Sequence, residues 1–314
     1  MTAGSRRCLI PFLAALLVAG ASAAIALAQG QPPDQPAVTV RGQTYTPRSI
    51  LARNMGTEAD QTTAFPPHRV IGNIYYVGTN SLATFLIATP QGHILIDTGT
   101  QKMAAVVFPN IVKLGYKPAD IKLMLISHAH YDHMETMETI RRITGATVAA
   151  LEAEVPALVS GHDLSSNETW GQEPIQVGRV LKSGDDVTLG GSTIKVIWTP
   201  GHTLGAAAYF INTQENGRAY QIVFGGPPGP ITGDAKYDTR PEDAFNSYKA
   251  LRALNPDILI SGHPQNLLKG KLDALWANKR PSPLALQPGQ WTKMIDDSEA
   301  NFRKRLAETN APAR

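Results

Sequence analysis

The sequence predicts an α/β (α+β) protein in which β-sheets pack on each other and helices cover them on the outside. The sequence contains short apolar runs bounded by turn residues, with segments of helical spacing interspersed among them. The predicted strands gather in runs rather than alternating strictly with helices, which favours sheet-on-sheet packing. The composition, 43% hydrophobic and 18% charged, is typical of a globular protein.

The first 28 residues have the pattern of an export signal. Arg6-Arg7 is a positive start, residues 9–26 are apolar, and Ala26-Leu27-Ala28 is an A-x-A cleavage site. We therefore expect a mature periplasmic chain that begins near Gln29. Export would use the Sec route or, since the arginine pair weakly resembles a twin-arginine signal, the twin-arginine route. An uncleaved membrane anchor is the alternative.

Net charge and cysteine content indicate which partners and which metal ligands to expect. The formal net charge of +3 falls to about +1 when Arg6 and Arg7 are removed. Without a basic cluster, we expect no nucleic-acid partner, and after signal cleavage no stable membrane association. Cys8, the only cysteine, lies in the signal, so a metal site in the mature chain must use histidine and carboxylate ligands.

The mature chain is predicted to hold an N-terminal arm and one domain. Residues 29–63 begin with a Pro-, Thr- and Gln-rich stretch without a clear period, and we expect an extended arm there. The regular pattern begins near Val70 and continues almost to the end, so residues 64–314 form the expected domain.

Periodicity and turn residues predict the elements of the first half of this domain. Gly115 and Gly145 mark the ends of two predicted helices, and residues 164–176 are polar and irregular, as in a loop. The expected strands are 71–77, 82–88, 93–96, 123–126 and 148–150, and the expected helices are 101–114, 135–143 and 152–160.

The second half of the domain is also predicted to mix strands and helices, and the sequence shows no clear internal repeat. The expected strands are 186–189, 193–199, 206–212, 220–224 and 257–260. The expected helices are 241–254 and a charged C-terminal helix at 291–307.

A cluster of metal-competent side chains directly follows the apolar run 123–126. His128, His130, Asp132 and His133 fall within six residues. Histidine nitrogen binds zinc at roughly 2.0–2.1 Å and carboxylate oxygen at roughly 2.0–2.2 Å, so such ligands must sit on a tight turn. The alternative is a histidine-rich surface loop without metal, which this density of ligand types after a buried strand disfavours.

Two further histidines also follow predicted strands. His202, in Thr-Pro-Gly-His-Thr, comes after strand 193–199, and His263, in Ser-Gly-His-Pro, comes after strand 257–260. Each lies beside a glycine that lets the backbone bend. Loops at strand ends commonly build functional sites, so we expect these histidines to join the cluster. His68, His93 and His162 lack this context, and we expect structural or surface roles for them.

The His-x-His-x-Asp-His motif with two later Gly-His pairs resembles the metallo-β-lactamase superfamily. The similarity extends from about Ala64 to Leu306 and points to the class B, subclass 3 enzymes. The segments that carry it are Tyr75–Thr79, Pro90–Gly99, Gly184–Gly191 and the terminal residues Glu299, Phe302, Arg303 and Leu306.

The resemblance implies a four-layer αββα sandwich that binds two Zn²⁺ ions per chain. It implies zinc-dependent hydrolysis of the β-lactam amide bond by a metal-bound hydroxide, hence antibiotic resistance, with a β-lactam or related cyclic amide or ester as the small-molecule substrate. Asp132 would be catalytic by orienting the nucleophile. The implied ligands are His128, His130 and His202 for one zinc, and Asp132, His133 and His263 for the other.

One departure favours three ligands per metal. Relatives of the glyoxalase II and lactonase types carry a metal-bridging Asp after the strand that follows the Gly-His motif, and other metallo-β-lactamases carry Cys there. This chain has Pro227 at that position, and proline cannot bind zinc. Asp234 is a weak substitute candidate.

Other departures concern the substrate. Met134 to Met137 replace a small or Gly-rich segment, and serines that help to bind a substrate carboxylate are missing near Pro227. Thr232 or backbone N–H groups remain as substitutes. The alternative function is therefore another hydrolase of this fold (lactonase, thioesterase or other ester hydrolase), and a third is a non-enzymatic zinc-binding protein. Iron and manganese also suit these ligands.

Overall fold

The structure is a computed structural model of the whole chain. It describes residues 38–40, 43–45, 56–162, 172–227, 240–264, 273, 274, 277 and 282–309. The predicted signal, Thr232 and Asp234 lie outside the described residues. Within the described residues, no helix is long and apolar enough to cross a membrane.

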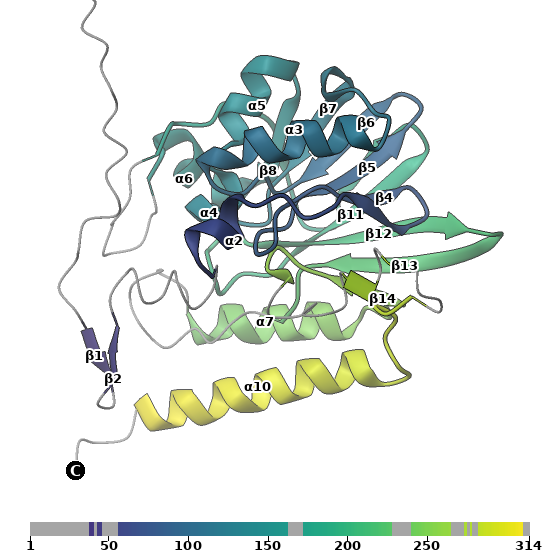
Figure 1. Cartoon of the computed structure of the whole chain (residues 1–314). Helices are drawn as coiled ribbons and strands as arrows, with labels where there is room; N and C mark the ends of the chain where they lie inside the picture. The colour runs from purple at the N-terminus through teal and green to yellow at the C-terminus, as the bar shows by residue number, and fades with distance from the viewer. Residues whose placement is uncertain are drawn as a thin grey trace, which may run out of the picture.

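Two mixed sheets form the centre of the domain (Figure 1). The seven-stranded sheet has the order β3-β4-β5-β6-β7-β8-β9 and the five-stranded sheet the order β10-β11-β12-β13-β14. The first comprises His68–Ile71, Ile74–Tyr76, Phe85–Thr89, Gly92–Ile96, Ile121–Leu125, Thr147–Leu151 and Val177–Leu181. The second comprises Asp186–Leu189, Ser192–Trp198, Ala207–Glu215, Arg218–Phe224 and Ile258–Ile260.

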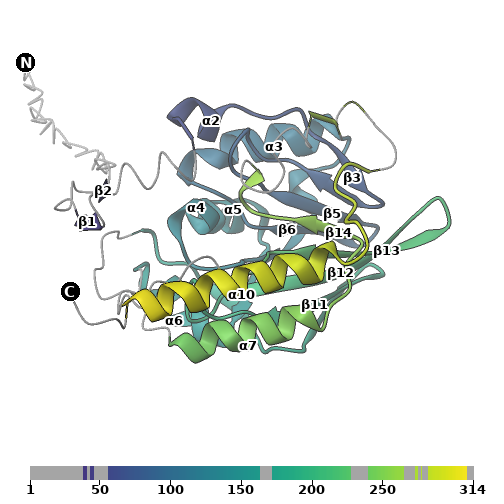
Figure 2. The ribbon, with the colours of Figure 1, turned by 90° about the horizontal axis from the view of Figure 1, so that it is seen from below.

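Helices cover the outer faces of the two sheets (Figures 1 and 2). The group on the seven-stranded sheet includes α3 (Ala104–Lys113), α4 (Tyr131–Met134), α5 (Met137–Thr144) and α6 (Val155–Ser160). The group on the five-stranded sheet is α7 (Pro241–Arg252) and α10 (Gln290–Thr309). Short 3₁₀ turns lie at Gln101–Met103, Pro118–Asp120 and Glu152–Glu154. The predicted αββα sandwich is confirmed.

Three apolar layers hold this sandwich together. On β6, Ile94 and Ile96 belong to the core between the sheets, whereas Leu95 belongs to the core beneath the helices. On β13, Phe224 faces the inter-sheet core and Val223 faces α7. Strands buried on both faces need continuous apolar sequence, which explains why these segments show no polar alternation.

Strand direction brings the functional loops to one edge. Strands β6, β7, β8 and β9 run parallel, as do β13 and β14. Parallel strands end on the same side of a sheet, where ligand sites of α/β proteins usually lie. The segments that follow β7, β11 and β14 carry the histidine motifs.

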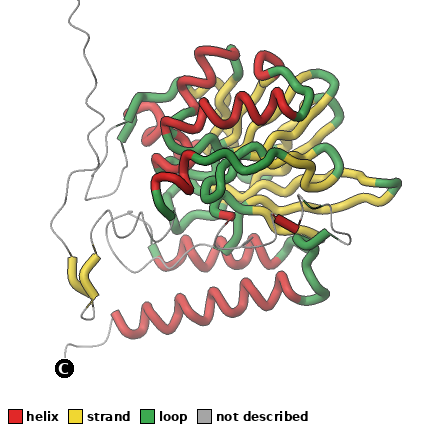
Figure 3. Tube along the Cα trace, in the orientation of Figure 1, coloured by secondary structure: helices red, strands yellow, loops and turns green. Residues whose placement is uncertain are grey.

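The structure differs from the sequence expectations in several places (Figure 3). The expected strand 71–77 is interrupted: Ile71 is the last residue of β3, and β4 begins at Ile74, because Gly72 turns the backbone with a φ of 53°. Strand β9 was not expected. Its exposed positions and its glycine give it no strand pattern.

The described part of the N-terminal arm contains regular elements that were not expected from the sequence. It holds short strands β1 (Val38–Val40) and β2 (Gln43–Tyr45), and helix α2 (Glu58–Thr62). A capping box of Thr57 and Asp60 starts this helix, which is a local signal readable in the sequence.

Candidate metal centre

The His-x-His-x-Asp-His motif folds into a tight turn at the end of β7. His128 and His130 lie in the loop, and α4 begins directly after them, so that Asp132 and His133 sit on its first turn. The backbone N–H of His133 bonds to the carbonyl of His130, which closes the turn. All four side chains are thereby directed to one region.

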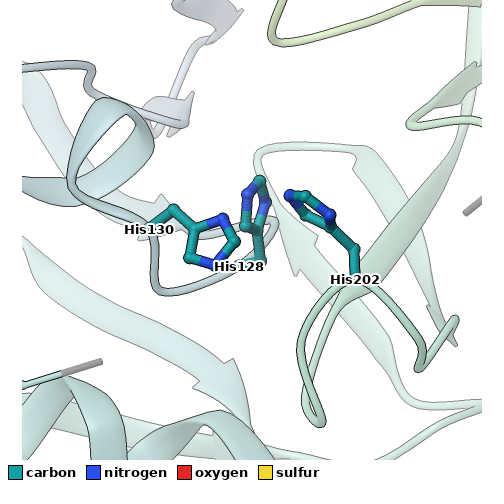
Figure 4. A group of neighbouring side chains, drawn as sticks. All are labelled: His128, His130 and His202. Atoms are coloured by element: carbon teal, nitrogen blue, oxygen red, sulfur yellow. The ribbon is translucent and has the colours of Figure 1, made fainter. Parts of the chain in front are cut away.

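The first group comprises His128, His130 and His202. Each pair of these rings has its centroids 4.6 Å apart. Their ligand atoms lie within 4.8 Å of one another, which makes the three histidines a candidate ligand group for one zinc ion. Figure 4 shows the three rings turned toward one another, His202 arriving from a separate loop.

The second group comprises Asp132, His133 and His263. The Nε2 atoms of the two histidines are 3.0 Å apart. Asp132 Oδ2 lies 3.5 Å from Nε2 of His133 and 3.3 Å from Nε2 of His263. The rings of His128 and His133 have their centroids 4.0 Å apart, so the two groups adjoin. The structure therefore brings together all six residues that the sequence singled out.

A buried carboxylate orients one histidine of each group. Asp97, directly after β6, accepts hydrogen bonds from His133 Nδ1 (2.7 Å), from the Ser127 backbone N–H (2.7 Å) and from Ser127 Oγ (2.8 Å). Ser127 Oγ also lies 3.0 Å from His128 Nδ1. Because the Nδ1 atoms are engaged, the Nε2 atoms of both histidines remain for a metal, which is the usual support of a metal-bound histidine.

The side chains of His133 and Asp97 leave no room for a larger residue at position 262. A Cβ atom on Gly262 would lie 2.6 Å from Cε1 and 2.9 Å from Nδ1 of His133. Asp97 itself has a φ of 53°, which few non-glycine residues other than Asp and Asn adopt. Sequence reasoning missed Asp97, Ser127 and this role of Gly262. The readable signal was a charged residue at the end of a wholly apolar strand.

Burial and neighbouring charges shift the pKa values of several residues in the two groups. Burial, reinforced by neighbouring imidazoles, lowers the pKa of His128 and His130 well below the usual value, so both rings are neutral at pH 7. Burial opposes ionisation of Asp132, but His133 and His263 outweigh it and lower its pKa. Burial opposes the charge on His133, yet Asp132 and Asp97 raise its pKa to about 8.

A buried nitrogen atom of the first group also fits metal binding. The Nε2 atom of His128 has no hydrogen-bond partner among the described residues. A buried polar atom is normally satisfied, and a bound metal would satisfy this one. Five imidazoles and one carboxylate, gathered in two groups of three, are ligand types that zinc prefers.

The three remaining histidines of the described residues lie outside the two ligand groups. His68 is buried, stacks on Tyr76 with ring centroids 5.6 Å apart, and lies 2.9 Å through Nδ1 from the carbonyl of Pro66. His93 is buried against Tyr116. His162 is exposed and follows α6. None belongs to either ligand group.

The end of β13 carries no ligand in its described part. After Phe224 the chain continues through Gly225 and Gly226 to Pro227, and the described residues offer no carboxylate or thiol there. The N–H of Gly225 bonds to the carbonyl of Ile260, which joins this strand end to the segment before His263.

The chain belongs to the metallo-β-lactamase superfamily, whose family model matches residues 77–263. Among solved structures, the subclass B3 metallo-β-lactamase BJP-1 of Bradyrhizobium japonicum is 32% identical, with a TM-score of 0.72 over 79% of this chain and 96% of that one. The di-zinc class B3 enzyme LRA-12 from an Alaskan soil metagenome is 28% identical, with a TM-score of 0.68 over 80% of this chain and 97% of that one.

The curated relatives include hydroxyacylglutathione hydrolases. The hydroxyacylglutathione hydrolase of Bartonella quintana is 29% identical over 160 residues, or 50% of this chain and 53% of the relative. The chain thus spans about half the length of the curated relatives it matches, whereas it matches subclass B3 structures over nearly their full length.

Proposed function

We propose that this chain is a zinc-dependent hydrolase of β-lactams. The observation that carries the proposal is the pair of three-residue ligand groups with no carboxylate at the described end of β13. The bridging Asp of the glyoxalase II type would lie there. The near-complete match to subclass B3 structures supports the same substrate class.

The first metal would be held by His128, His130 and His202, and the second by Asp132, His133 and His263. Bound zinc supplies Lewis acidity, which polarises a carbonyl and acidifies water. Asp97 fixes His133 and, through Ser127, His128, so that their Nε2 atoms face the site.

Asp132 is the proposed catalytic carboxylate. It is ionised and lies on the first turn of α4, beside His133 and His263. In this position it accepts a hydrogen bond from the attacking water and orients its lone pair toward the substrate carbonyl. Because the proposed nucleophile is water, the proposed route needs no acyl-enzyme.

A second candidate is thioester hydrolysis, favoured by the hydroxyacylglutathione hydrolases among the curated relatives. Pro227 disfavours it, because that position lacks the carboxylate that joins the two metals in the glyoxalase II type.

The test is a substrate panel on zinc-loaded protein. We expect ring opening of at least one penicillin, cephalosporin or carbapenem, abolished by a chelator and restored by added zinc. The kcat/KM for a hydroxyacylglutathione thioester should be lower. Turnover of the thioester alone would establish the second candidate, and turnover of nothing by a two-zinc protein would favour the non-enzymatic alternative.

Periplasmic location and antibiotic resistance are part of the proposal, supported by the export-signal pattern of residues 1–28. N-terminal sequencing of the protein from a periplasmic fraction should give a start near Gln29. Expression should raise the β-lactam concentration that a bacterial host survives, and the Asp132→Asn variant should not. A full-length protein retained in the membrane would contradict cleavage.

A further inference from the structure

Glu154 is a buried carboxylate for which the ligand groups and the proposed chemistry give no role. It lies at the end of the 3₁₀ turn after β8 and is 3% exposed. A buried carboxylate is costly unless hydrogen bonds satisfy it. Glu154 starts α6, but its side chain makes no capping hydrogen bond to that helix, so helix capping does not explain it.

The Glu154 carboxylate joins the two loops that carry the first ligand group. Oε1 accepts from the backbone N–H of Ala129, which lies between His128 and His130. The same oxygen accepts from Thr203 Oγ1 at 2.8 Å, next to His202. Oε2 accepts from the backbone N–H of Gly205 at 2.8 Å.

The packing at Gly205 is independent support for this contact. A Cβ atom there would lie 2.5 Å from Glu154 Oε2 and 2.6 Å from its Cβ. The loop that carries His202 therefore rests directly on Glu154, and only glycine allows the approach.

We propose that Glu154 is a positioning residue that fixes the loop of His128 and His130 against the loop of His202, and so sets the spacing of the first three metal ligands. His133 of the second group is held by Asp97 instead. Removing the Glu154 acceptor should therefore weaken the first metal site and spare the second.

Glu154→Gln is the decisive substitution because it keeps the side-chain shape. An amide has one acceptor oxygen and an NH₂ group that cannot accept from a backbone N–H, so Ala129 or Gly205 loses its acceptor. Glu152→Gln is the matched control, since Glu152 is exposed on the same turn. Thr203→Val and Thr203→Ser test the same carboxylate from the donor side.

The inference rests on the proposed metal sites but not on the substrate, so cobalt(II) titration of metal-free protein tests it. In a His263→Ala background, which leaves the first group intact, Glu154→Gln should weaken binding roughly 10-fold to 100-fold, as is usual for residues that orient metal ligands. In a His202→Ala background, which leaves the second group intact, the dissociation constant should stay within about twofold. Glu152→Gln should change neither.

Unchanged cobalt binding by Glu154→Gln in the His263→Ala background would overturn this inference alone. Equal weakening in both backgrounds would also overturn it, because general destabilisation would then explain the loss. Absence of cobalt binding by the unsubstituted protein would overturn both this inference and the proposed function. If Glu154→Gln does not fold, the Thr203 variants provide the test. Thr203→Val should weaken cobalt binding at the first site, whereas Thr203→Ser, which keeps the hydroxyl, should bind cobalt as the parent does. Equal cobalt affinities of the two Thr203 variants would refute the positioning role of Glu154.

Discussion

Single residues determine which ring nitrogen of His128 and of His133 faces the centre. Asp97 and Ser127 occupy the Nδ1 atoms of His133 and His128, and this leaves Nε2 for a metal. The candidate ligands and the residues that orient them therefore have different roles in the site. Ligands supply donor atoms, whereas Asp97, Ser127 and Glu154 supply direction and spacing.

Asp132→Asn should keep the fold and lower kcat by roughly 10²–10⁴-fold, because the amide neither carries the charge nor accepts the proton of an attacking water as well. Steady-state kinetics on a hydrolysed β-lactam, with circular dichroism as a fold check, measures the effect. Near-normal turnover would remove Asp132 from the mechanism.

Asp97→Asn should destabilise the metal-free protein. Asn tolerates the positive φ of position 97, but its NH₂ group cannot accept all three hydrogen bonds that the carboxylate accepts. Losing a hydrogen bond to a charged group costs about 1.5–3 kcal/mol, and urea unfolding should show a loss of that size. Asp297→Asn, on the exposed face of α10, should cost less than about 0.5 kcal/mol. Equal effects would show that Asp97 is not held as described.

At the scale of helices and strands, a glycine ends helix α5 and an ion pair lies within it. Helix α5 ends at Gly145, which has a φ of 71°, a left-handed conformation in which most other residues are strained. Nothing lies within 4 Å of a Cβ atom placed there, so the cost of a substitution comes from the backbone alone.

Gly145→Ala should therefore lower the free energy of unfolding by about 1 kcal/mol, since L-residues are strained in the left-handed region. Gly145→Asn should lose less, because Asn tolerates this conformation. Denaturant unfolding curves compare the three proteins. An alanine variant as stable as the parent would mean that α5 does not end in this geometry.

Glu138 of α5 gives a pH-dependent contribution to stability. Hydrogen bonds from Arg141 lower its pKa below the ordinary value of 4.5. A lowered folded-state pKa stabilises the protein above the unfolded-state pKa, and the contribution disappears as pH falls through the folded-state value. Glu138→Gln should thus cost roughly 1–3 kcal/mol at pH 7, and less as the pH falls below 4. A difference that stays constant between pH 7 and pH 3 would refute this origin.

The sequence predicted most elements and singled out the six residues that the structure gathers in two candidate ligand groups, for two different reasons. Strands buried on both faces and helices ending at glycine have strong local patterns, and four ligands lie in one short motif. The contacts of Asp97 and Glu154 join segments 25 to 51 residues apart, which no local pattern reveals. Strand β9 was missed because its exposed positions give no apolar period.

For the whole molecule, the candidate metal centre connects the two sheets. Four ligands follow β7 of the seven-stranded sheet, whereas His202 and His263 follow β11 and β14 of the five-stranded sheet. A metal in either group would therefore hold the layers together at this edge. The apolar core between the sheets supports the same arrangement without metal.

Zinc should accordingly raise the thermal unfolding midpoint. Free zinc at about 100 times its dissociation constant stabilises the folded state by roughly 2.7 kcal/mol per site. For a chain of this size that corresponds to a shift on the order of 5–10 °C. Calorimetry with zinc and with a chelator measures it, and His202→Ala should show a smaller shift than the parent. A midpoint independent of zinc would contradict metal binding by the folded state.

The central claim, that six side chains form two metal sites, is tested most directly by native mass spectrometry of zinc-loaded protein. The parent should carry two zinc ions, and His202→Ala and His263→Ala should each carry one, because each loses a ligand from a different group. A parent that carries no zinc, or variants that still carry two, would contradict the account.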